Sequence, residues 1–101
     1  MNTAIEIYKL FQTKGILVDK EIIIFKNYCH DFIESCKDLE LTILGIDGFA
    51  IKNNRTYVNT TEISDFSKTK EDIENCYVLA TLFINKMFKH STSDGYLFTL
   101  K

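Results

Sequence analysis

The feature that most constrains the fold is an apolar stripe in the N-terminal third of the chain. Its residues recur three and four positions apart: Ile22, Phe25, Cys29, Phe32 and Cys36. This spacing places the side chains on one face of an α-helix, and Ile33 widens that face. Asp19 has a side chain that can cap the first turn. The pattern therefore predicts a helix over residues 20–37 with one buried face.

Two further helices are predicted. Residues 3–14 carry apolar side chains at helical spacing, and Gly15 follows where a left-handed C-terminal cap would stand. Later in the chain, Thr69 and Asp72 match a capping box in which Asp replaces the usual Glu or Gln. The apolar stripe after this cap predicts a third helix that ends near His90.

Between and after these helices the sequence is typical of strands and turns. The predicted strands are residues 41–46, 49–51, 56–58 and 96–100. Gly45 and Gly48 predict a kink or bulge between the first two strands, and Asn53-Asn54 predicts the turn before the third. Residues 59–61 predict a loop. The fold class is therefore α+β: two N-terminal helices, an antiparallel β-hairpin, a third helix and a short C-terminal strand.

Length and charge limit the classes of function. A chain of 101 residues corresponds to a single domain, residues 1–101, here expected to have two layers. The net charge of −2 and the single arginine, Arg55, argue against direct binding of nucleic acid. No basic segment followed by an apolar run opens the chain, and no apolar stretch approaches the ~20 residues of a membrane span. We therefore expect a cytoplasmic protein that does not bind membranes.

Three cysteines, Cys29, Cys36 and Cys76, follow the apolar stripes. An odd number at low density does not suit a secreted disulfide scaffold. Cys29 and Cys36 lie a heptad apart on the predicted helix, about 10 Å along its axis, which is too far for a disulfide. The pattern predicts reduced thiols, at least two of them buried.

The sequence offers no convergent set of catalytic or metal-binding groups. The two histidines, His30 and His90, lack metal-ligand spacing to a cysteine. The segment from Gly45 to Gly48 lacks the glycine pattern of a phosphate loop. We therefore expect no enzymatic activity, no metal and no cofactor. An enzyme that uses Cys76 or Cys29 is the alternative, and a rapidly alkylated thiol would favour it.

Carboxylates gather in the hairpin, in the loop after it and at the start of the third helix. They are Asp47, Glu62, Asp65, Glu71, Asp72 and Glu74. Together with Tyr57 and Phe49 as apolar anchors, they could bind a basic partner, since charge steers the encounter and aromatic side chains anchor it. Two structural explanations compete: carboxylates stabilise a helix N-terminus, and Phe49 could pack in the core.

The middle third of the chain resembles small bacterial immunity proteins of the colicin and contact-dependent growth inhibition type. Gly48-Phe49, Ile63 and Asp65-Phe66-Ser67 carry the resemblance, but the Pro often found in comparable loops is absent. The resemblance implies a cytoplasmic inhibitor that binds a cognate toxin domain, commonly a nuclease, and occludes its active site. It implies no catalytic residues. A phage or mobile-element accessory protein that binds a host protein is the alternative, and the oligomeric state stays open.

Overall fold

The computed structural model describes residues 3–90 and 92–101. Its five strands form one antiparallel sheet in the order β1-β2-β5-β3-β4. The strands are β1 (Gly15–Val18), β2 (Glu21–Phe25), β3 (Ile43–Lys52), β4 (Arg55–Asp65) and β5 (Gly95–Leu100). The helices are α1 (Thr3–Phe11), the 3-10 turn η1 (Lys26–Tyr28), α2 (Cys29–Asp38), α3 (Lys70–Glu74) and α4 (Cys76–His90).

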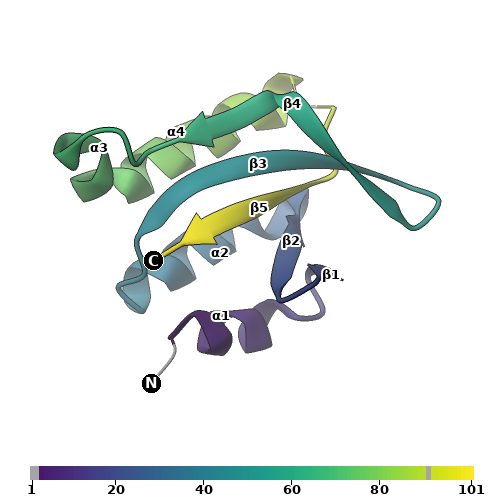
Figure 1. Ribbon diagram of the computed structural model, residues 1–101, viewed down its shortest axis with the longest axis horizontal. Helices are drawn as coiled ribbons and strands as arrows, with labels where there is room; N and C mark the ends of the chain where they lie inside the picture. Colours follow the sequence, from purple (N-terminus) through teal and green to yellow (C-terminus); the bar gives the residue numbers. More distant parts are fainter. Residues whose placement is uncertain (1–2, 91) are drawn as a thin grey trace.

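One hydrophobic core lies between the sheet and the helices. Figure 1 shows α2 and α4 behind the strands, with α1 below β2. Phe32 of α2 lies at the centre of this core, with ring centroids 5.0 Å from Phe11 of α1 and 4.7 Å from Phe98 of β5. Ile46 belongs to this core, whereas the next residue along β3 points to the opposite face. We call that opposite face of the sheet the outer face. The predicted α+β class with two layers is confirmed.

The predicted helix over residues 20–37 is wrong in its first half. Residues up to Phe25 form the β1–β2 hairpin, which turns at Asp19 with φ of 55°, and α2 begins only at Cys29. Three consecutive isoleucines, 22–24, favour a strand because their β-branched side chains are restricted in a helix. Ile22 and Ile24 enter the core from one face of β2, and their spacing with Phe25 and Cys29 imitates a helical stripe.

Gly15 does not cap a helix. The helix α1 ends at Phe11, and none of the described glycines has a positive φ. Gly15 instead begins β1, where a Cβ atom would lie 2.2 Å from the carbonyl oxygen of Ile23 and 2.7 Å from the Cγ2 atom of Ile22. The close approach of two strands, and not an unusual dihedral angle, requires glycine here.

The substitution Gly15→Ala is therefore expected to lower the free energy of unfolding by about 1–3 kcal/mol, as overpacking does, because backbone must move to admit the methyl group. Urea unfolding measures this change. Thr13→Ala, at an exposed neighbouring position, is the control and should change stability by less than about 0.5 kcal/mol. A stabilised Gly15→Ala variant would contradict the close approach, since alanine limits the unfolded chain more than glycine does.

Strands β3 and β4 form one long hairpin. The predicted turn at Asn53-Asn54 is confirmed, with φ of 50° and 63°, as a tight two-residue connection requires. The predicted irregularity between strands is confirmed at Asp47 and Gly48, but β3 continues through it without a break. The predicted loop at 59–61 is wrong, because these residues lie within β4. Asp47 of β3 pairs with Ile63 and the next residue, Gly48, pairs with Asn59, so residues 60–62 have no partner on β3 and form a bulge.

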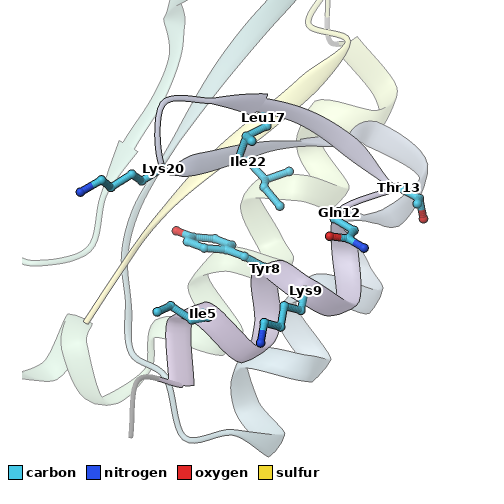
Figure 2. Close-up of a pocket in the computed structure, with 8 residues that line it drawn as sticks. All are labelled: Ile5, Tyr8, Lys9, Gln12, Thr13, Leu17, Lys20 and Ile22. Carbon is cyan, nitrogen blue, oxygen red and sulfur yellow. The ribbon is translucent and has the colours of Figure 1, made fainter.

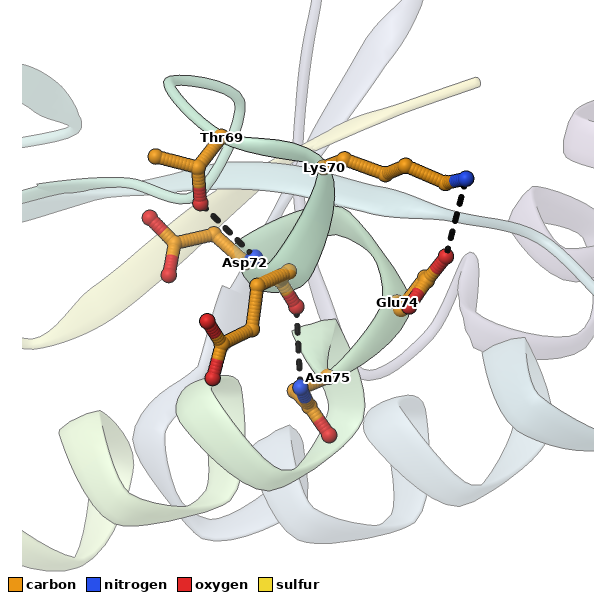
Figure 3. Close-up of polar contacts among 6 residues, drawn as sticks. Thr69, Lys70, Asp72, Glu74 and Asn75 are labelled. Carbon is orange, nitrogen blue, oxygen red and sulfur yellow. Dashed lines mark hydrogen bonds and ion pairs between the residues drawn. The ribbon is translucent and has the colours of Figure 1, made fainter.

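The predicted third helix is two helices. Thr69 caps the first as predicted, since its Oγ1 accepts a hydrogen bond of 3.0 Å from the backbone N–H of Asp72 (Figure 3). Asn75 then interrupts the helix: its side-chain Nδ2 donates to the carbonyl oxygen of Glu71 at 2.9 Å. Side-chain bonds of this kind compete with the helical ladder. The predicted C-terminal strand is confirmed as β5, one residue longer than expected.

Candidate functional site

A hollow opens on the outer face of the sheet where β3, β4 and β5 meet. Its volume is about 340 Å³. It is lined by Leu44, Gly45, Asp47, Ile63, Ser64, Asp65, Ser67 and Thr99. We call it the acidic hollow, because Asp47 and Asp65 are its charged residues.

The strand register brings the lining residues together. Asp47 pairs with Ile63 of β4 on one side and with Leu97 of β5 on the other. Directly paired residues of antiparallel strands point to the same face, so these side chains share the outer face. Phe49 lies two residues further along β3 on this same face, outside the core cluster. Its alternative role as a core residue is therefore wrong.

Asp47 has an unusual environment for a carboxylate. It is half-buried, and desolvation by this burial raises its pKa above the ordinary value. No residue within 3–90 and 92–101 donates a hydrogen bond to it or pairs with it as a cation. A carboxylate that is desolvated in a hollow and lacks a cationic partner gains most from one supplied by another molecule.

Asp65 is held in a different way. Its Oδ1 accepts hydrogen bonds from the hydroxyl of Ser67 at 2.5 Å and from the backbone N–H of Ser67 at 2.8 Å. These two bonds lower the pKa of Asp65, the side-chain bond most. The carboxylate is therefore ionised and fixed at the rim of the hollow.

Glu62 is not available at the surface, contrary to the sequence-based prediction. It is only 6% exposed. Its Oε1 accepts a bond of 2.8 Å from the hydroxyl of Tyr96, and its Oε2 accepts bonds from Asn59 Nδ2 at 2.5 Å and from the backbone of Thr92 at 3.3 Å. The carboxylate therefore ties the irregular part of β4 to the segment before β5.

The other predicted contact residues lie elsewhere. Glu71, Asp72 and Glu74 belong to α3, where Glu74 pairs with Lys70 at 3.9 Å (Figure 3). Tyr57 is 51% exposed on β4, near the turn that projects at the opposite end of the molecule from α3 (Figure 1). Only Asp47 and Asp65 of the predicted set line one hollow.

Sequence reasoning missed several members of the hollow. Ser67 had a local signal, since an aspartate two residues before a serine is typical of a turn closed by the side chain. Thr99 and Leu44 had no local sequence signal, because only the strand order β5-β3-β4 brings them beside Asp47.

Within residues 3–90 and 92–101, no three His, Cys, Asp or Glu side chains converge on a possible metal position. None of the described helices has the length and apolar character needed to cross a bilayer. No protein-family model matches the sequence, and no curated protein matches it significantly.

The three cysteines are buried, as predicted, and are free thiols. Burial raises the pKa of Cys29 and of Cys36 to about 12. The sulfur of Cys76 accepts a hydrogen bond from the backbone N–H of Ile43 at 3.4 Å.

Alkylation tests whether any of these thiols is reactive. Because the raised pKa keeps Cys29 and Cys36 protonated at pH 8, iodoacetamide should modify them at least about 100-fold more slowly in the folded protein than in urea. Mass spectrometry over time measures the rates. Rapid modification of one cysteine in the folded protein would instead support a cysteine-dependent enzyme.

Proposed function

We propose that this protein is a cytoplasmic immunity protein that binds and neutralises a cognate bacterial toxin domain, without enzymatic activity of its own. The observation that carries this proposal is Asp47, a desolvated carboxylate in an open hollow where strands β3, β4 and β5 meet. The resemblance of the segment around Gly48-Phe49 and Asp65-Phe66-Ser67 supplies the class of partner. The buried thiols suit a reducing compartment.

In the proposed complex a lysine or arginine of the toxin enters the acidic hollow. Asp47 forms an ion pair with this side chain at the centre of the hollow, and Asp65 adds a second carboxylate at the rim. Ile63, which is 49% exposed, and Phe49 supply apolar contact around this pair. Toxins that cleave nucleic acids need basic surfaces for the phosphates, so an acidic inhibitor seated there would block the substrate.

Co-expression tests the proposal. The gene directly upstream is expressed with and without this protein, and cell growth is followed. We expect growth arrest from the upstream product alone and full growth with this protein, together with a stoichiometric complex whose toxin activity is lost in vitro. Persistent arrest, or a complex with undiminished toxin activity, would contradict the proposal and favour an accessory protein that binds a host factor.

A further inference from the structure

A second concave surface lies at the opposite edge of the sheet, between α1 and the β1–β2 hairpin. We call it the α1 groove; its volume is about 550 Å³. It is lined by Ile5, Tyr8, Lys9, Gln12, Thr13, Leu17, Lys20 and Ile22. Figure 2 shows the Tyr8 ring between the helix and the hairpin, with Ile22 and Leu17 above it.

Both walls of the groove are built from regular structure. Ile5 and Tyr8 lie on one side of α1, because they are three residues apart, and Gln12 follows the end of the helix. Leu17 and Ile22 are direct partners across the hairpin and therefore project from one face of it toward α1. Strand β2 was predicted as the start of a helix, so this groove had no counterpart in the sequence-based expectations.

The walls of the groove carry apolar surface, and lysines lie on its rim. Leu17 is 68% exposed and Ile5 is 51% exposed, so apolar surface faces water there. Lys9 and Lys20 are exposed on the rim, and neither pairs with a carboxylate within the described part of the chain. The hydroxyl of Tyr8 points along the groove to the end of the hairpin that carries Lys20 (Figure 2).

Tyr8 supplies an uncharged hydrogen-bond donor, its hydroxyl, to the groove that Lys9 and Lys20 also line. Burial raises its pKa, and the charge of Glu21 raises it further, so the hydroxyl stays protonated at neutral pH. The Tyr8 hydroxyl points toward the end of the groove that carries Lys20, and a protonated hydroxyl together with an ammonium group favours a ligand oxygen that carries negative charge. The nearby carboxylate of Glu21 repels the negative charge of such a ligand.

We propose that the α1 groove binds a small amphiphile with an aliphatic body and a carboxylate head, such as a medium-chain fatty acid. The aliphatic chain lies on Ile5, Tyr8, Leu17 and Ile22. The carboxylate accepts a hydrogen bond from the Tyr8 hydroxyl and lies within the field of the two lysines.

Size and shape favour this ligand over larger partners. The groove falls within the range of small-molecule sites, ~300–1,000 Å³, which are mainly apolar with a few polar groups. The groove lies between the helix α1 and the β1–β2 hairpin, and the flat surface of a bilayer does not fit into such a concave shape. A second copy of the chain would bring its own Lys9 and Lys20 against the same cations. The proposal does not depend on the acidic hollow or on the proposed toxin.

Titration with decanoate, below its micelle-forming concentration, tests the site. We expect amide resonances of residues 5–22 to shift in ¹H–¹⁵N spectra. Decanol and decyltrimethylammonium are the matched ligands with the same chain. Exposed ion pairs are weak, so decanoate should bind about twofold to thirtyfold more tightly than decanol. Decyltrimethylammonium should bind most weakly.

Variants assign the ligand to the groove. Lys9→Gln with Lys20→Gln should bring the affinity for decanoate down to that for decanol, whereas Leu17→Ser should weaken both. Lys37→Gln with Lys68→Gln and Leu82→Ser, at exposed positions outside the groove, are the matched controls and should change neither. Equal affinities for decanoate and decanol in the parent protein would overturn the proposal. Shifts confined to the acidic hollow, or binding only to phosphatidylglycerol vesicles, would do the same.

Discussion

Replacing Asp47 by asparagine is expected to weaken binding of the proposed toxin partner by about 100-fold while leaving the fold at least as stable. Removing one member of a desolvated charge pair costs ~2–5 kcal/mol of binding free energy, and each 1.4 kcal/mol is a factor of ten. Isothermal titration calorimetry with the toxin domain measures the affinity, and urea unfolding measures the stability of the free protein.

The expected loss of binding and the expected gain in stability have the same cause, which is the burial of the Asp47 carboxylate. Burial raises the pKa of Asp47 in the folded protein, so folding favours the protonated form. At a pH above that raised pKa, the ionised carboxylate therefore costs stability, and the cost disappears as the pH falls below the ordinary value. Asparagine resembles the protonated form and removes the cost at neutral pH. A residue that destabilises the free protein but strengthens a complex is typical of a functional site.

Other substitutions locate the edge of the interface. Asp65→Lys with Asp72→Lys should reduce protection of toxin-producing cells, mostly through Asp65, because Asp72 lies on α3 outside the hollow. Glu34→Lys, an exposed change on α2, is the control. If Glu34→Lys abolishes protection and the Asp65 and Asp72 changes do not, the binding face lies on the helices and the assignment to the hollow is wrong.

Some local signals in the sequence predicted local structure correctly, whereas those at Gly15 and at residues 59–61 did not. The Thr69 cap and the Asn53-Asn54 turn depend on neighbours within a few residues, and both are confirmed. The β1–β2 hairpin was missed because Ile22, Phe25 and Cys29 keep helical spacing across a strand, a 3-10 turn and a helix start. Spacing alone cannot separate these cases, whereas the β-branched residues 22–24 could have done so.

The site was predictable only in part, since its geometry depends on pairing between distant segments. Asp47 and Asp65 were identified as candidates, but their approach follows from the β3–β4 register and from the strand β5 beside it. Glu62 shows the limit most clearly. Residues 59–61 before it are polar and typical of a surface loop, yet the extra residues of β4 turn it inward toward Tyr96.

The buried position of Glu62 leads to the largest expected effect on stability. Glu62→Ala should lower the free energy of unfolding by about 3 kcal/mol, since hydrogen bonds to a charged group contribute ~1.5–3 kcal/mol and buried donors then lose their acceptor. The buried donor is the hydroxyl of Tyr96, which is 0% exposed. The part-buried amide of Asn59 and the backbone N–H of Thr92 also lose this acceptor.

Urea unfolding monitored by circular dichroism measures this loss, which should also lower the melting temperature by roughly 12–24 °C for a chain of this size. Glu74→Ala, which removes an exposed carboxylate paired at 3.9 Å, is the matched control and should cost less than about 0.5 kcal/mol. Glu62→Gln keeps the shape and one acceptor oxygen, so its loss should fall between the two. If Glu62→Ala is no more destabilising than Glu74→Ala, the carboxylate does not hold β4 to the segment before β5. Glu62 would then return to the candidates for a partner contact.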